Sequence, residues 1–119
     1  MNVSDSEALA CTAARAADER KGEQISILTV GDLLQITEFF VIASASNRRL
    51  VRSIVETIEE EVKLHHDRSP LRIEGIAELQ WVLMDYGDVV VHVFTDETHD
   101  YYEIERLYRD VVRVDWTAD

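Results

Sequence analysis

The sequence predicts an α/β (α+β) fold, in which helices pack on a mixed β-sheet of about five strands. Runs of β-branched residues with the length of strands alternate with helical stretches. Residues 79–94 contain two apolar runs of strand length joined by a short acidic link with one glycine, a pattern typical of a β-hairpin at the centre of a sheet. With 119 residues, the chain is large enough for one core and too small for two, so a single domain is predicted for 1–119.

The first part of the chain predicts one helix and two strands. Residues 4–20 favour a helix because alanine is abundant while glycine and proline are absent, and Gly22 is suited to end it. Residues 25–30 form a short β-branched run that predicts the first strand. Gly31 interrupts this run, and residues 36–44 predict a second strand that is apolar enough to be internal.

The rest of the chain predicts two more helices around the hairpin. Residues 48–66 predict a helix because apolar residues recur with a period of 3.6, namely Val51, Ile54, Val55, Ile58 and Val62. Residues 72–75 predict a short edge strand or an extended loop. A last helix is expected over 96–109, with Thr95 or the acidic residue after it as the cap. Residues 111–116 predict a strand or an extended strap.

The hairpin is expected to present two apolar faces. If Asp85 and Asp88 flank a two-residue connection, Met84 lies opposite Val89. Because side chains alternate along a strand, one face then carries Trp81, Leu83, Asp85, Asp88, Val90 and His92, and the other Val82, Met84, Val89 and Val91. Both faces need a cover, which either the chain's own helices or another protein supplies.

The charge of the chain limits its partners. Twelve lysines and arginines against 24 aspartates and glutamates give a formal net charge of −12. Such a chain is repelled by phosphate backbones, so little direct nucleic-acid binding is expected. Its long-range attraction is to basic surfaces, including basic proteins. The alternative interpretation is that the charge only keeps the protein soluble.

The sequence predicts a cytoplasmic protein. No apolar run approaches the roughly 20 residues that span a bilayer, so no membrane association is expected. Residues 1–10 contain acids and lack the pattern of a secretory signal. The single cysteine, Cys11, cannot form a disulfide within the chain, which suits a reducing compartment.

Catalytic groups are sparse. Asp85, Asp88 and His92 could bind a divalent cation or share a proton on one face of the hairpin. Nucleotidyl transfer instead needs two carboxylates alternating on one strand and a Gly-Ser turn for phosphate, and the acids here lie at a turn. The phosphate-loop and nucleophile-elbow motifs are absent. We therefore expect no enzyme activity, cofactor or metal. Asp85 and Asp88 are expected to bind turn amides, and His92 is expected to be a packed, hydrogen-bonded histidine.

Aromatic residues predict an interaction surface. Trp81 and Tyr86 lie on the hairpin, and Tyr101 and Tyr102 lie in the first turns of the last helix. Rings of this kind are the usual anchors of protein interfaces. The alternative is that Trp81 and Tyr101 are core residues. Tyr101 and Tyr102 are consecutive in a helix, so at least one of them should meet solvent or a partner.

Three segments carry a family resemblance. They are residues 81–92 (WVLMDYGDVVVH), residues 102–107 (YEIERL) and residues 36–48. Together they resemble the ribosomal silencing factor family (RsfS, also called Iojap-like), over about residues 7–110 and leaving 111–119 as a C-terminal tail. The chain departs from the family pattern at His99, where arginine is typical, and at Tyr108, where tryptophan is typical.

The resemblance implies a specific function. Family members are non-enzymatic factors that bind the large ribosomal subunit through ribosomal protein L-fourteen. They block joining of the small subunit, which represses translation in starvation or stationary phase or guards immature subunits. The family fold is similar to the nucleotidyltransferase sheet without its active site. The resemblance further implies a monomer on the ribosome and homodimers of the free protein. The alternatives are a degenerate nucleotidyltransferase-fold enzyme and a homodimeric interaction module unrelated to ribosomes.

The predicted contact residues lie in the hairpin and the last helix. The apolar anchors are expected to be aromatic, with Leu83 or Met84 beside them, depending on which hairpin face is open. Acidic and tyrosine side chains should flank them. The full set comprises Trp81, Leu83, Met84, Asp85, Tyr86, Tyr101, Tyr102 and Glu105.

Overall fold

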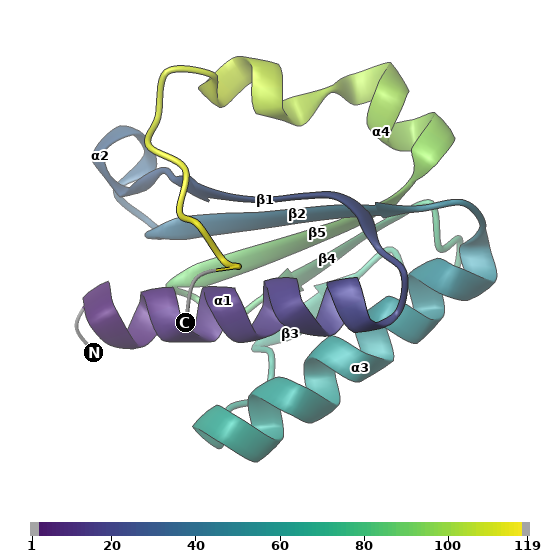
Figure 1. The fold of residues 1–119 in the computed structure, drawn as a ribbon, viewed down its shortest axis with the longest axis horizontal. Helices are drawn as coiled ribbons and strands as arrows, with labels where there is room; N and C mark the ends of the chain where they lie inside the picture. Colours follow the sequence, from purple (N-terminus) through teal and green to yellow (C-terminus); the bar gives the residue numbers. More distant parts are fainter. Residues whose placement is uncertain (1–2, 118–119) are drawn as a thin grey trace.

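The computed structural model describes residues 3–117, which form one mixed sheet with helices on both faces (Figure 1). Within these residues the sheet has five strands in the order β1-β2-β5-β4-β3. Neighbouring strands are antiparallel except for β2 and β5, which are parallel. The predicted fold class is therefore confirmed, with strands β1 (Glu23–Thr29), β2 (Phe39–Ala45), β3 (Arg72–Glu74), β4 (Trp81–Asp85) and β5 (Val89–Thr95).

Two long helices cover one side of the sheet, which we call the helix-covered face (Figure 1). They are α1 (Val3–Glu19) and α3 (Arg48–His66), and both lie close to the ranges predicted from the sequence. The side chain of Asn47 caps α3 by accepting a hydrogen bond from the Leu50 amide at 2.9 Å. Small side chains let α1 approach the sheet closely, since Ala10, Ala13, Ala14 and Ala17 are fully buried.

The opposite side of the sheet has a thinner cover, and we call it the open face. Its apolar cluster consists of Leu28, Val30, Phe40, Ile42 and Phe94. Helix α4 (Asp96–Tyr102) and the 3-10 helix η1 (Ile104–Tyr108), drawn in yellow-green in Figure 1, lie over part of this face. The sheet's two faces are thus covered unequally by the chain itself.

The C-terminal segment runs along β1 as an extended strap. For residues 111–116 the sequence predicted either a strand or such a strap. The Thr29 amide donates to the Val112 carbonyl at 2.9 Å, and the Val114 amide donates to the Ile27 carbonyl at 3.0 Å. Leu28 and Arg113 form an isolated antiparallel bridge. These bonds satisfy backbone groups of β1 that have no neighbouring strand on that side.

The predicted register of the hairpin was wrong by two positions. The Tyr86 amide donates to the Val89 carbonyl at 2.9 Å, so the connection is Gly87-Asp88, with Gly87 at a φ of 93° that favours glycine. Met84 consequently pairs with Val91 and not with Val89. A shift of two positions leaves each side chain on the same face, because side chains alternate with period two. The predicted division of the strand residues between two faces is therefore confirmed.

The predicted last helix is broken in the structure. Helix α4 ends at Tyr102 because Glu103 adopts a left-handed φ of 42°, and its amide donates to the His99 carbonyl at 2.8 Å. The chain then turns, and Ile104 and Tyr108 pack on the apolar cluster of the open face. A straight helix would carry these side chains past the sheet.

A short helix was not predicted. Helix α2 (Gly31–Leu34) occupies the link between the first two strands and ends at Gln35, which has a left-handed φ of 60°. Strand β2 therefore begins at Phe39, three residues later than the start predicted from the apolar run.

Candidate functional site

A groove crosses the open face above β4 and β5. It has a volume of about 350 Å³, and its floor includes Phe40, Leu83, Val90 and His92. Ile36 and Leu71 stand on opposite sides of it, because they precede β2 and β3, which flank the β5–β4 pair. Their exposed fractions are 83% and 74%, unusually high for large apolar residues. The uncovered part of the sheet is therefore a hollow with apolar walls.

A row of aromatic rings continues from this groove. Trp81 packs on Tyr102 with a centroid distance of 5.1 Å, and Tyr102 contacts Tyr101 at 4.9 Å. Tyr101 and Tyr102 are 80% and 54% exposed, while Trp81 is half-buried against Phe94. We call Trp81, Tyr102 and Tyr101 the aromatic row. The structure thus brings three of the four predicted aromatic residues together, by ring packing between β4 and the end of α4.

Two predicted contact residues are in the core instead. Met84 and Tyr86 are 0% and 1% exposed, and both belong to the cluster beneath α1 and α3. Burial raises the pKa of the Tyr86 phenol. Their prediction as surface anchors was wrong, since no partner can reach them without displacing the helices. The sequence left open whether Leu83 or Met84 lies beside the aromatic anchors, and the structure places Leu83 on the open face.

The hairpin carboxylates bind groups within the chain. Asp85 accepts a hydrogen bond from the Gly87 amide at 2.8 Å, and Arg72 lies 3.4 Å from its other oxygen. Asp88 forms an ion pair with Arg68 at 2.7 Å. Burial favours a higher pKa for Asp88, but hydrogen bonds from Arg68 and Ser6 outweigh it, so its pKa is lowered. The turn-amide interpretation is confirmed for Asp85, whereas Asp88 is held by a side-chain pair.

His92 is a packed, neutral histidine at the floor of the groove. It is 4% exposed, and burial lowers its pKa to about 4. Its Nδ1 atom accepts a hydrogen bond from the Trp81 indole at 3.1 Å. Among the described residues, no three His, Cys, Asp or Glu side chains form a group that could hold a metal ion.

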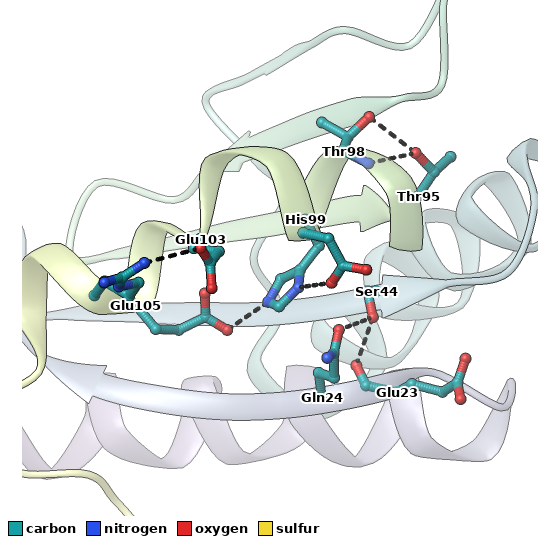
Figure 2. A network of polar contacts seen from close by, with 10 residues as sticks. Glu23, Gln24, Ser44, Thr95, Thr98, His99, Glu103 and Glu105 are labelled. Carbon is teal, nitrogen blue, oxygen red and sulfur yellow. Dashed lines mark hydrogen bonds and ion pairs between the residues drawn. The ribbon is translucent and has the colours of Figure 1, made fainter.

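Glu105 braces the break between α4 and η1 (Figure 2). Its Oε2 atom lies 2.6 Å from His99 Nε2, while His99 Nδ1 is 3.4 Å from Asp100. Burial favours a lower pKa for His99, but the bonds to Glu105 and Asp100 outweigh it, so the His99 pKa is raised. The Glu105 side chain is only 17% exposed. Glu105 therefore differs from its predicted role as a flanking contact, because it holds η1 in place.

The sequence prediction missed the walls of the groove. Leu34 ends α2, and Ile36, Thr37 and Leu71 lie in connections. Their placement follows from how α2 and the segment before β3 fold back. The available signal was the occurrence of large apolar residues beside Gly31 and Pro70, in stretches with no apolar period. Over residues 3–117, no helix has the length and apolar character needed to cross a bilayer.

Comparisons with known proteins agree on one family. The model of the family described as "Ribosomal silencing factor during starvation" matches residues 3–119. The ribosomal silencing factor RsfS of Halalkalibacterium halodurans is 34% identical over 103 residues, which are 87% of each chain. A crystal structure of a protein from Chromobacterium violaceum superposes with a TM-score of 0.81 at 28% identity, covering 92% of this chain and 88% of that one.

A more distant relative has a descriptive name. The mouse protein called mitochondrial assembly of ribosomal large subunit protein 1 is 28% identical over 92 residues, which are 76% of this chain and 40% of the mouse protein. The resemblance seen in residues 81–92 and 102–107 is thus confirmed by matches that extend over most of the chain. Because the family model extends over almost the whole sequence, the chain belongs to the ribosomal silencing factor family.

Proposed function

We propose that this protein binds the large ribosomal subunit through ribosomal protein L-fourteen and sterically blocks joining of the small subunit. Translation is then repressed during starvation, or immature subunits are guarded. The observation that carries the proposal is the open face, where an apolar groove continues into exposed aromatic rings. The choice of L-fourteen as the contact rests on the family resemblance.

The chemistry of the open face suits a protein partner. Leu83 and Val90 form an apolar floor, and Tyr101 and Trp81 supply the kind of rings that dominate binding energy at interfaces. Monomeric proteins rarely expose contiguous apolar and aromatic surface unless it forms a binding site. On the helix-covered face the strand residues lie beneath α1 and α3, and the hollow of about 620 Å³ along these helices is lined mainly by polar and charged side chains such as Glu7, Arg15 and Glu61.

Charge supports a basic protein as the partner. The net charge of −12 disfavours contact with ribosomal RNA and steers the chain toward a basic surface. Locally, Glu97 and Asp100 are exposed beside Tyr101, and together with Gln80 they line a second hollow of about 440 Å³. A lysine or arginine side chain that enters there meets carboxylates and the face of a ring.

Silencing by exclusion requires affinity and position, with no reaction. Of the groups that an enzyme could have used, Asp85 and Asp88 are engaged in contacts within the chain, and His92 is buried with its Nδ1 atom bound to Trp81. We infer a non-enzymatic factor without a cofactor, which acts in the cytoplasm as a monomer on the ribosome. A homodimer of the free protein would compete with this activity if it covered the open face.

Sedimentation with separated ribosomal subunits tests the proposal. The protein should migrate with the large subunit through a sucrose gradient, and adding it should reduce the amount of reassociated ribosomes. A parallel gradient with the small subunit alone is the control. Protein that stays at the top of the gradient in both cases contradicts the proposed function.

A further inference from the structure

Two buried polar groups line the groove without a hydrogen-bond partner. Within residues 3–117, His92 Nε2 and Thr37 Oγ1 are closed to water and make no hydrogen bond to the protein. Both side chains are more than nine-tenths buried, and both residues line the groove. A buried polar group without a partner is destabilising, so native proteins seldom keep one without a reason.

The contact with Trp81 fixes which His92 nitrogen carries the proton. An indole N–H can only donate, so His92 Nδ1 must accept with its lone pair. The ring is neutral at pH 7, because burial lowers its pKa to about 4. Its one proton is therefore on Nε2, which makes that atom a hydrogen-bond donor. Phe40 packs edge-on at 4.7 Å and offers at most a weak aromatic contact to this N–H.

Thr37 marks a second position along the same groove. His92 pairs with Ile42 in the sheet, and Thr37 lies five residues before Ile42 on the chain. The two polar groups are thus separated along the strand direction, and one ligand atom cannot serve both. An extended main chain carries a carbonyl at every residue, and can therefore supply acceptors at both positions.

The remaining lining selects against charge. Phe40, Leu83 and Val90 are apolar, and they would desolvate any charge brought to the floor. At the rim, Arg72 lies 3.4 Å from Asp85, so the two rim charges offset each other and an ionised group gains little there. A lysine or arginine would bring a donor against the N–H donor of His92. A neutral oxygen flanked by apolar side chains fits all of these groups.

We propose that the groove binds an extended segment of the basic partner protein. A main-chain carbonyl of that segment accepts from His92 Nε2–H, Thr37 Oγ1 bonds a second main-chain group, and an apolar side chain packs between Ile36 and Leu71. Because His92 Nε2 and Thr37 Oγ1 are closed to water in the free protein, side chains of the groove must shift as the segment enters. This inference rests on the proposed function, because it describes how the docking partner is recognised at the same surface.

Binding of purified large subunits to labelled protein tests the inference. Thr37→Val keeps the shape of the side chain and removes the hydroxyl. His92→Phe keeps a ring and removes the Nε2–H donor together with the Nδ1 acceptor of the Trp81 indole, so Thr37→Val is the decisive variant. Each should weaken binding about tenfold, the usual effect of losing one buried hydrogen bond. Tyr86→Phe is the matched control, because it removes another buried, unpartnered hydroxyl, on the helix-covered face, and should bind like the wild type.

The outcomes separate this inference from the proposed function. If the wild type itself does not bind the large subunit, the proposed function fails. If the wild type binds and the folded Thr37→Val and His92→Phe variants bind equally well, the recognition by polar groups is wrong. NMR of the imidazole nitrogens supplies a test that does not depend on the ribosome. The free protein should show the Nε2–H form of His92, and an Nδ1–H form would overturn the assignment.

Discussion

The two faces of the sheet use residues of one strand in opposite ways. Along β4, Val82 and Met84 are fully buried beneath helices, whereas Leu83 between them lies half-buried at the floor of an open groove. The difference is made by what the chain lays over each face, because both sets of side chains are apolar. The helix-covered face provides stability, and the open face keeps apolar surface available for a partner.

Replacing one residue on each side of β4 should give the largest contrast. Met84→Ala removes a fully buried side chain and should lower the free energy of unfolding by about 2–5 kcal/mol. Leu83→Ala should cost about 1 kcal/mol of stability but clearly weaken binding to the large subunit. Urea unfolding and gradient sedimentation measure the two effects. Equal losses of stability in both variants would remove the distinction between the faces.

The Arg68–Asp88 pair should stabilise the hairpin turn on the helix-covered side, where Ser6 of α1 also donates to Asp88. Asp88→Asn should lower the free energy of unfolding by about 1–3 kcal/mol at pH 7. The folded pKa of Asp88 lies below its unfolded value of 3.8, so this stabilisation is complete above that value and is lost as pH falls through the folded pKa. Urea unfolding from pH 7 to pH 3 should show the wild type converging on the variant. A difference that stays constant with pH contradicts the assignment.

The His99–Glu105 brace should make the cover of the open face sensitive to pH. The folded pKa of His99 is raised above 6.5, so its stabilisation is complete below pH 6.5 and is lost as pH rises through the folded pKa. Amide exchange in α4 and η1 should therefore quicken as the pH rises above 6.5 and through the folded pKa, beyond the intrinsic increase, by an amount equivalent to about 1–2 kcal/mol.

Two variants at this brace provide the controls. Glu105→Gln removes the carboxylate and should abolish the extra pH dependence. His99→Arg keeps a permanent positive charge beside Glu105 and should hold the segment closed across the same range. If the wild type and His99→Arg respond to pH alike, the brace does not act through this histidine.

Tyr101 should show the smallest effect on stability. Because its side chain is 80% exposed, Tyr101→Ala should change the free energy of unfolding by less than about 0.5 kcal/mol while reducing binding to the large subunit. Leu64, 72% exposed on α3, is the matched control, and Leu64→Ala should alter neither quantity. A binding loss shared by both variants would mean that the open face is not the docking side.

Periodicity predicted the elements better than it predicted where they turn. The apolar side of α3 could be predicted because Val51, Ile54 and Ile58 recur with the helical period. The two faces of the hairpin were assigned correctly despite the wrong register, because a shift of two positions leaves every side chain on the same face. Tyr86 was misjudged because the sequence Asp-Tyr-Gly-Asp allows two placements of a two-residue turn. In the observed placement Tyr86 extends the strand and points beneath the helices.

Long-range contacts explain the remaining differences. Glutamate favours helices, so the local sequence does not predict that the helix ends at Glu103. The break instead follows from long-range contacts, in which Ile104 and Tyr108 pack on the sheet and Glu105 pairs with His99. The groove is assembled from connections about 35 residues apart in sequence, around Ile36 and Leu71. Local patterns do not encode how such segments meet.

The strap along β1 has a consequence for self-association. An unpaired outer strand is a template for adding strands from other molecules, and the bonds of Val112 and Val114 occupy that template on β1. At the other border, β3 has only three residues, two of which are the charged Arg72 and Glu74. Both borders are therefore guarded against sheet extension, so copies of this protein that meet at high concentration should associate face to face and resist forming fibrils.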